Sequence, residues 1–180
     1  FSLNLHLKEV DKGCGDAIYS FMMERLKAYY KDANIDRNVY EAVLAVSPDS
    51  PLDFHLRVEA LSEFTQSEDS KSLIESNKRI ANILKDSNEK NEKLNPKILI
   101  DDSEVKLFNA TVSLSKQLSE IKDYKEVMKS LIDLKDLIDS FFDNVMVNAD
   151  DEKLKSSRLA LIRRIRALFL SVADISYLSS

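Results

Sequence analysis

The sequence predicts an all-α fold, an irregular bundle of about seven helices preceded by a short extended segment. Only two glycines and three prolines occur among 180 residues, whereas β-sandwiches and barrels need many turn residues. From residue 16 onward, apolar residues recur at the three- and four-residue spacing of amphipathic helices. Hydrophobic residues make up 44% of the chain and charged residues 32%, which is typical of a globular domain with a charged surface. No apolar run approaches the roughly 20 residues of a membrane span.

The first fourteen residues are interpreted as a linker from an upstream domain. Phe1, Leu3, Leu5 and Leu7 alternate with polar residues, a pattern typical of extended chain. Both glycines lie in the sequence Gly-Cys-Gly at 13–15, which predicts a hinge. The chain begins without an initiator methionine, so we interpret it as part of a longer protein. The helical domain is expected to occupy residues 15–180.

The periodicity predicts four helices before residue 87. The first, at 16–32, begins after Asp16 as a candidate N-cap and places Ile18, Phe21, Met22, Leu26 and Tyr29 on one apolar face. A short helix at 36–46 follows. Pro51 begins the third, because a first-turn proline lacks only an N–H that would have no intrahelical partner. The fourth is expected at 68–86.

The sequence pattern of the second half of the chain predicts three more helices after a polar loop. The loop at 86–96 reads DSNEKNEKLNP, a composition typical of irregular structure. Helices are expected at about 101–121, where Asp101 or Asp102 opens the helix, at 123–146, and from Asp150 or Asp151, acids that suit a helix N-terminus, to about 176. No repeat of fixed period is present, so an irregular bundle is favoured over a solenoid.

The charge balance argues against a general polyanion binder. The chain has 26 Lys and Arg and 31 Asp and Glu, a net charge of −5, whereas such binders are strongly basic. Residues 151–180 differ, with six basic and three acidic residues. The single cysteine cannot form an internal disulfide, which fits a reducing, cytoplasmic environment.

Residues able to support catalysis are few. His6 and His55 stand alone without partner spacing, and a metal site needs three or four convergent ligands. Cys14 has no base near it in sequence, so it is a poor candidate nucleophile. Neither GxxxxGK[ST] nor GxGxxG is present. We therefore predict no catalytic residues, no metal site and no cofactor for this chain.

Two arginines interrupt apolar stripes. Arg158 falls within the stripe of the last helix, and Arg25 lies between Met22, Leu26 and Tyr29 in the first. One interpretation is a buried or half-buried arginine paired with a carboxylate. The other is a guanidinium that is presented to a phosphate or a base at a helix junction.

Two polar strips are candidate RNA-binding surfaces. Lys155, Arg163 and Arg166 lie opposite the apolar face of the last helix. Lys78, Asn82 and Lys85 follow the polar side of the fourth helix, and lysine and asparagine together suit phosphates and base edges. An ordinary solvated helix surface is the alternative for both strips.

Several stretches resemble one family. Residues 141–176 read FFDNVMVNADDEKLKSSRLALIRRIRALFLSVADIS and strongly resemble the C-terminal end of the β subunit of the bacterial heterotetrameric glycyl-tRNA synthetase. Residues 21–29 (FMMERLKAY), 39–45 (VYEAVLA) and 58–84 (VEALSEF through NKRIANIL) fit the same subunit in the same order. In that family this region is a helical anticodon-binding domain of the DALR type, and RLAL at 158–161 lies within its C-terminal helix.

The resemblance implies recognition of glycine tRNA at a distance from the chemistry. The family attaches glycine to tRNA with ATP, in an α2β2 assembly whose α subunit holds the aminoacylation site. We therefore expect this chain to be a tRNA-binding part of a glycine–tRNA ligase that does not catalyse alone. Neither DNA nor a membrane is an expected partner. The alternative is a structural helical domain that docks subunits without contacting RNA.

Overall fold

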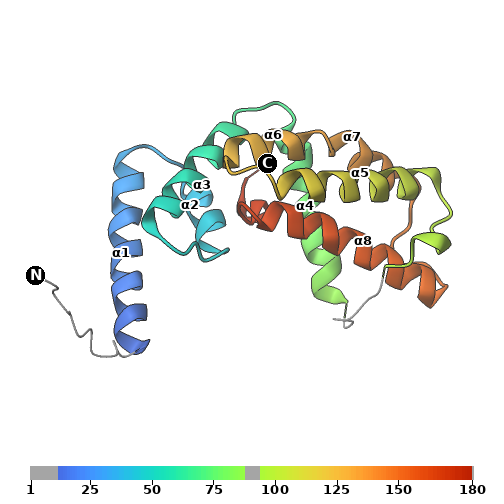
Figure 1. The fold of residues 1–180 in the computed structure, drawn as a ribbon, viewed down its shortest axis with the longest axis horizontal. Coiled ribbons are helices and arrows are strands. Elements are labelled where there is room, and N and C mark those ends of the chain that lie inside the picture. Colours follow the sequence, from blue (N-terminus) through green and yellow to red (C-terminus); the bar gives the residue numbers. More distant parts are fainter. Residues whose placement is uncertain (1–11, 88–93, 180) are drawn as a thin grey trace, which may run out of the picture. The chain divides into compact units, whose positions relative to one another are not determined.

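The structure, a computed structural model, describes residues 12–87 and 94–179 (Figure 1). Within these ranges it contains eight α-helices, two short 3-10 helices and no strand, which confirms the predicted all-α class. The extended segment expected at 1–10 and the middle of the loop expected at 86–96 lie outside the described residues. The chain divides into two compact units, residues 1–36 and 37–180. The domain boundary expected between residues 14 and 15 stays a prediction.

The first unit contains the helix α1 (Lys12–Asp32). The hinge predicted at 13–15 is wrong, because α1 already includes both glycines and Asp16 is not its N-cap. Glycine costs only about 1 kcal/mol relative to alanine within a helix, so two glycines do not prevent one. The apolar face predicted for this helix is largely exposed: the exposed fractions of Ile18, Phe21 and Tyr29 are 53%, 57% and 59%.

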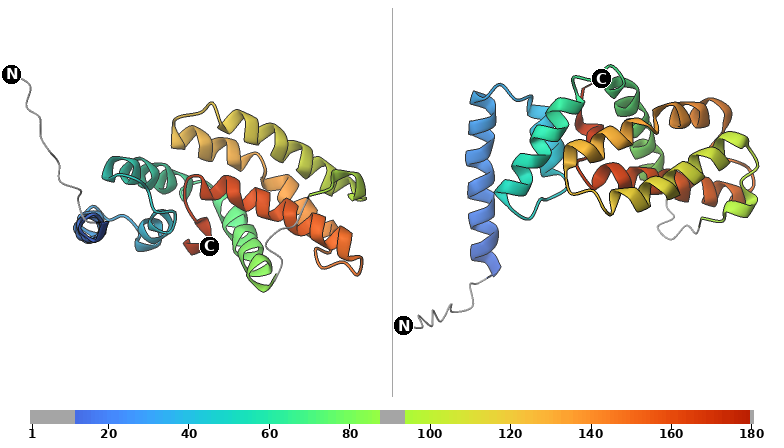
Figure 2. Two further views of the ribbon diagram at one scale, coloured as in Figure 1. Left: turned by 60° about the horizontal axis from the view of Figure 1, so that its bottom comes forward. Right: turned by 45° about the horizontal axis from the view of Figure 1, so that its top comes forward.

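The second unit holds the remaining helices and the core. They are α2 (Arg37–Leu44), α3 (Pro51–Phe64), α4 (Ser70–Asp86), η1 (Pro96–Ile98), α5 (Asp102–Leu118), α6 (Tyr124–Ile132), α7 (Lys135–Asn144), α8 (Glu152–Leu170) and η2 (Ile175–Tyr177). Helix α3 packs along α6, α5 packs along α7 and α8, and α4 contacts α7 and α8 (Figures 1 and 2). Phe54, Phe141 and Phe169 are among the largest fully buried side chains.

Three predicted helix starts are confirmed by their local hydrogen bonds. Pro51 opens α3, and the N-cap Ser50 accepts a hydrogen bond from the backbone of Asp53. Asp101 forms a capping box with Glu104 at the start of α5. Asp151 caps α8 by accepting from two backbone N–H groups. Each cap satisfies N–H groups that have no partner within the helix.

The helix predicted at 123–146 is two helices. Helix α6 ends at Ile132 and α7 begins at Lys135. Leu131, Leu134 and Ile138 are buried across the break. Because α6 packs on α3 whereas α7 packs on α4 and α5, the bend lets one apolar stripe meet two differently placed partners.

The last helix ends six residues earlier than predicted. After Leu170 the chain turns, and Val172, Ala173 and Ile175 enter the core. The backbone N–H of Asp174 donates to the carbonyl of Ala42 at 2.9 Å rather than within α8. This C-terminal segment packs on α2 and α4, so burial of its apolar residues outweighs continuation of the helix.

Candidate functional site

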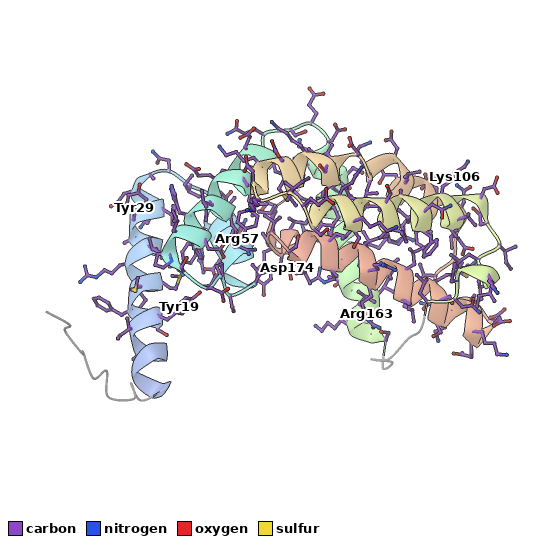
Figure 3. All side chains as sticks on the ribbon, viewed as in Figure 1. Tyr19, Tyr29, Arg57, Lys106, Arg163 and Asp174 are labelled. Carbon is purple, nitrogen blue, oxygen red and sulfur yellow. The ribbon has the colours of Figure 1, made fainter. Side chains whose placement is uncertain are left out.

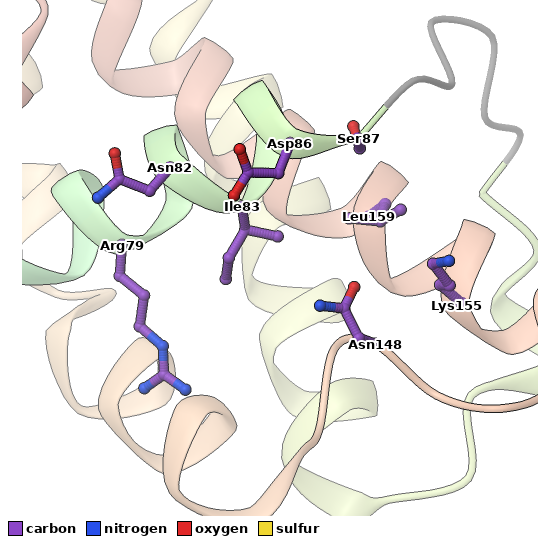
Figure 4. A pocket seen from close by; sticks show the side chains of 8 residues that line it. All are labelled: Arg79, Asn82, Ile83, Asp86, Ser87, Asn148, Lys155 and Leu159. Atoms are coloured by element: carbon purple, nitrogen blue, oxygen red, sulfur yellow. The ribbon is translucent and has the colours of Figure 1, made fainter.

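A groove of about 710 Å³ opens where α4, the loop before α8 and the first half of α8 meet (Figure 4). All three segments belong to the second unit. Eight residues line the groove: Arg79, Asn82, Ile83, Asp86, Ser87, Asn148, Lys155 and Leu159. The lining therefore combines two cations, one carboxylate, two amides and a hydroxyl with two aliphatic side chains.

One face of α4 forms the first wall. Arg79, Asn82, Ile83 and Asp86 follow the spacing i, i+3, i+4 and i+7, which places them on one side of a helix. The Cζ of Arg79 lies 4.3 Å from the centroid of the Phe142 ring, a cation–π contact. This contact holds a planar guanidinium at the groove while Arg79 stays exposed.

The loop at 145–151 and α8 form the opposite side. Asn148 is exposed and comes from the loop, whereas Lys155 and Leu159 lie one turn apart on α8 (Figure 4). Leu159 is 2% exposed and gives the groove an apolar base. The Nζ of Lys155 lies 3.7 Å from the Oε1 of the exposed Glu152. An ion pair with a solvent-exposed partner contributes little to the stability of the fold.

The structure brings together one residue from each predicted strip. Asn82 of α4 and Lys155 of α8 line the same groove. Lys85 is exposed and Lys78 is half-buried, and neither is among the lining residues. Whether any of these four side chains contacts RNA stays a prediction.

The other two cations of the α8 strip have protein partners. Arg163, labelled in Figure 3, is half-buried, and its Nη2 lies 3.4 Å from the Ser87 Oγ at the end of the groove. Arg166 Nη2 donates to Asp174 Oδ2 at 2.6 Å. Periodicity predicts an exposed Arg166, and that is wrong, because the chain after α8 turns back and brings Asp174 within reach. A contact of Arg166 with RNA stays a prediction.

The two arginines of the apolar stripes differ in environment. Arg158 is 9% exposed; its Nε donates to Glu104 Oε1 and its Nη1 donates to the carbonyl of Met146 at 2.8 Å. Arg25 is exposed, and its Cζ lies 5.2 Å from the ring centroid of Phe21. The geometry of Arg158 matches the interpretation of a buried arginine with a carboxylate partner.

Three residues that do not line the groove have shifted pKa values. Hydrogen bonds from Ser103 hold the pKa of Asp101 below its ordinary value. Burial raises the pKa of Tyr124. The hydrogen bond with Asp136 raises the pKa of Lys135.

Of the residues considered for catalysis or metal binding, the structure describes only the side chain of His55. The Nε2 of His55 lies 3.5 Å from Glu59 Oε1 in an exposed pair on α3. His6 lies outside the described residues, as does the side chain of Cys14. In the part of the chain that the structure describes, no three His, Cys, Asp or Glu side chains are grouped to hold a metal ion. No helix of that part has the length and apolar character needed to cross a membrane.

Six of the eight lining residues are absent from the predicted strips: Arg79, Ile83, Asp86, Ser87, Asn148 and Leu159. Arg79 and Asp86 each directly follow a predicted lysine of α4, and the i, i+3, i+4, i+7 set that begins at Arg79 is visible in the sequence. That signal could have been found by testing each register of the helix. Asn148 lies in a loop, where no periodicity indicates which side chains meet a neighbouring helix.

The described residues form an all-helical domain, and its groove is lined mainly by polar and charged side chains. Residues 73–175 match the DALR anticodon binding domain family, and this match includes every residue that lines the groove. The chain belongs to that family.

Longer proteins also resemble the chain. It is 41% identical over 165 residues to a protein named glycine–tRNA ligase beta subunit from Vibrio parahaemolyticus, with 89% of the chain and 24% of that protein covered. It is 40% identical to a protein of the same name from Mannheimia succiniciproducens, with 91% and 24% covered. The match to the one from Pseudomonas aeruginosa is 36% identical, with 92% and 25% covered. The chain spans about a quarter of the length of these relatives.

Proposed function

We propose that this chain binds the anticodon region of glycine tRNA as a domain of a glycine–tRNA ligase beta subunit, and that the groove between α4 and α8 is its RNA-binding site. The observation that carries the proposal is the position of the groove. Every lining residue lies within the stretch that matches an anticodon-binding family.

The lining chemistry supports an unpaired RNA segment as the ligand. Bases of single-stranded loops are bound by stacking on planar side chains and by hydrogen bonds to their edges. The guanidinium of Arg79 is planar and is supported from one side by Phe142. Asn82 and Asn148 each supply an amide that both donates and accepts. Lys155 supplies a cation for a phosphate.

The cations beside the groove are assigned to the RNA backbone. Lys78 and Lys85 directly precede Arg79 and Asp86 on α4, and Arg163 lies beside Ser87. A local cluster in a chain with a net charge of −5 favours one site over loose binding along any polyanion. We assign the base contacts to the groove, where Lys155 adds one phosphate contact, and the remaining phosphate contacts to these flanking residues.

The rest of the reaction belongs to the longer protein and its partner. In this proposal the complete cytoplasmic enzyme uses ATP to attach glycine to tRNA, as an α2β2 assembly with an α subunit that holds the chemistry. This domain contributes tRNA recognition without catalysing. It requires no metal or cofactor of its own.

The test measures the affinity of the 180-residue chain for two RNAs. One is a glycine tRNA transcript, and the other is the same transcript with its three anticodon nucleotides replaced. We expect the replacement to weaken binding about tenfold or more, since each well-matched base contact contributes about 1–3 kcal/mol of discrimination. Equal affinity for the two transcripts would contradict anticodon recognition. Absence of binding to either would favour the structural docking domain.

A further inference from the structure

The loop that carries Asn148 is fixed by alternating burial. Val145 and Val147 are each 5% exposed, whereas Met146 is 75% exposed and Asn148 is also exposed. Two buried valines therefore anchor the loop in the core. They fix the direction of the backbone but leave the peptide between them to be held by a hydrogen bond.

Arg158 supplies that hydrogen bond from within the core. Its Nη1 donates to the carbonyl of Met146 at 2.8 Å, two residues before Asn148. Its Nε donates to Glu104, whose exposed fraction is 0%. The guanidinium thus joins the loop before α8 to the start of α5.

Glu104 is itself held by the backbone. Its Oε2 accepts from the N–H of Ile100 at 2.8 Å and from that of Asp101 at 3.1 Å. A carboxylate with both oxygens occupied has little freedom, so it restrains the arginine that it binds. A guanidinium has a planar, rigid set of donors, so Arg158 transmits this restraint to the Met146 carbonyl.

Arg158 lies close to the groove in sequence but does not line it. Lys155 and Leu159 on the same helix are lining residues, whereas the side chain of Arg158 is only 11% exposed. Any effect of Arg158 on a ligand must therefore pass through a neighbouring element.

We propose that Arg158 is a positioning residue for RNA binding: by holding the Met146 carbonyl it sets the position of Asn148 in the groove. This inference rests on the proposed function for its RNA part. Its structural part, the restraint of the loop, can be measured without RNA.

The experiment uses Arg158→Lys, Asn148→Ala and the double variant in the 180-residue chain. Lysine keeps a positive charge beside Glu104, but one ammonium group does not reproduce the fork that holds two oxygens in fixed directions. Arg164→Lys, a change of the same type at an exposed position of α8, is the matched control. The probe is the glycine tRNA transcript, and folding of each variant is verified by thermal melting.

The first measurement is hydrogen exchange without RNA. Arg158→Lys is expected to speed exchange at residues 145–149 while α4 exchanges as in the wild type. Arg164→Lys is expected to change neither region. Unchanged exchange of the loop in folded Arg158→Lys would overturn the proposal, whatever the RNA results.

The second measurement is RNA affinity. Arg158→Lys is expected to weaken binding about three- to tenfold, the range that one lost hydrogen bond produces. Asn148→Ala is expected to weaken wild-type binding and to add little in the Arg158→Lys background, because neighbours that act together are not additive. Fully additive losses, or wild-type affinity in a folded Arg158→Lys chain, would overturn the RNA part.

The two measurements separate this inference from the proposed function. If the wild-type chain binds no RNA, the proposed function fails and the RNA part of the inference fails with it. The exchange data then still decide whether Arg158 restrains the loop.

Discussion

Arg25 in α1 and Arg158 in α8 occupy equivalent positions in their helical patterns but very different environments. Both interrupt an apolar stripe in the sequence. Arg158 is 9% exposed and bonded to Glu104, whereas Arg25 is exposed and lies over the ring of Phe21. An apolar stripe therefore does not by itself determine the burial of an arginine within it.

The difference in burial follows from the neighbouring helices that each unit provides. Helix α8 packs against α4, α5 and α6 within its own unit, and α5 supplies Glu104. In the described part of the first unit, α1 is the only helix, so no second helix of that unit covers its face. A buried charge needs a partner brought by another element, and α5 brings Glu104 to Arg158.

The largest expected effect comes from removing Arg158, and removal of Arg25 is the comparison. Arg158→Ala should lower the free energy of unfolding by about 2–4 kcal/mol, because it leaves Glu104 buried without its cation. Arg25→Ala should change it by less than about 0.5 kcal/mol, as is usual for an exposed side chain. Urea unfolding followed by circular dichroism measures both. Equal losses in the two variants would remove the contrast between the helices.

Arg57 provides a third case, a cation that no sequence pattern singled out. Its Nη1 donates to the carbonyls of Ser171 and Val172 at 2.7 and 2.8 Å, and its Nε donates to Asp53 at 3.0 Å. Arg57 is labelled in Figure 3. Arg57→Met, which keeps an aliphatic stem, should lower the free energy of unfolding by about 1–3 kcal/mol, because the end of α8 and Asp53 lose their donors.

Arg57→Lys is the control for this prediction. Lysine retains a charge that can bond one of the three acceptors. The free energy of unfolding of Arg57→Lys should therefore lie between that of the wild type and that of Arg57→Met. A loss below about 0.5 kcal/mol in Arg57→Met would show that water replaces these bonds without cost.

A smaller difference is expected between two arginines of α8. Arg166 is paired with Asp174, and their side chains are 18% and 12% exposed, whereas Arg164 is exposed. Arg166→Gln should cost about 1–2 kcal/mol through the lost charge-assisted bond. Arg164→Gln should change stability by less than about 0.5 kcal/mol. Thermal melting measures the stability of both variants. A larger loss in Arg164→Gln than in Arg166→Gln would contradict a stabilising role for the pair between Arg166 and Asp174 of the C-terminal segment.

The smallest effect concerns the alkaline pH range. Tyr124 has a raised pKa because burial and its hydrogen bond to Asp53 favour the neutral phenol. A raised pKa in the folded state gives stability that is complete below the unfolded value, about 10, and that is lost as the pH rises through the folded value. Tyr124→Phe should therefore flatten the fall in stability above about pH 10.

Urea unfolding at neutral pH and above pH 10 measures this change. Tyr177→Phe, at a site that is 54% exposed, is the matched control. If stability fell equally steeply at alkaline pH in the wild type and in Tyr124→Phe, ionisation of Tyr124 would not be a cause of that fall.

The local parts of the fold could be predicted from the sequence because their signals are local. Pro51, Asp101 and Asp151 start helices as expected, since a cap depends on a few adjacent residues. The break between α6 and α7 and the turn after Leu170 were not predicted. Both depend on where other helices lie, which periodicity within one segment does not contain.

The site was predictable only in part for the same reason. Asn82 and Lys155 were singled out on separate helices, but the groove that unites them depends on how α4 and α8 cross. Arg79 is absent from the predicted strip because that strip begins at its neighbour Lys78. The partner of Arg158 could not be named, because Glu104 lies 54 residues away in sequence.

The central claim is that groove residues read the anticodon while their neighbours on α4 contact phosphates. Two double variants with the same change in charge test it: Arg79→Gln with Lys155→Gln in the groove, and Lys78→Gln with Lys85→Gln beside it. The measurement is the affinity of each for the glycine tRNA transcript and for the anticodon-replaced transcript at several salt concentrations. The groove pair should lose discrimination between the transcripts. The neighbouring pair should keep it and show a salt dependence that is flatter by about 0.7–0.9 log–log units per cation. Intact discrimination in the groove pair, or its loss in the neighbouring pair, would contradict this account.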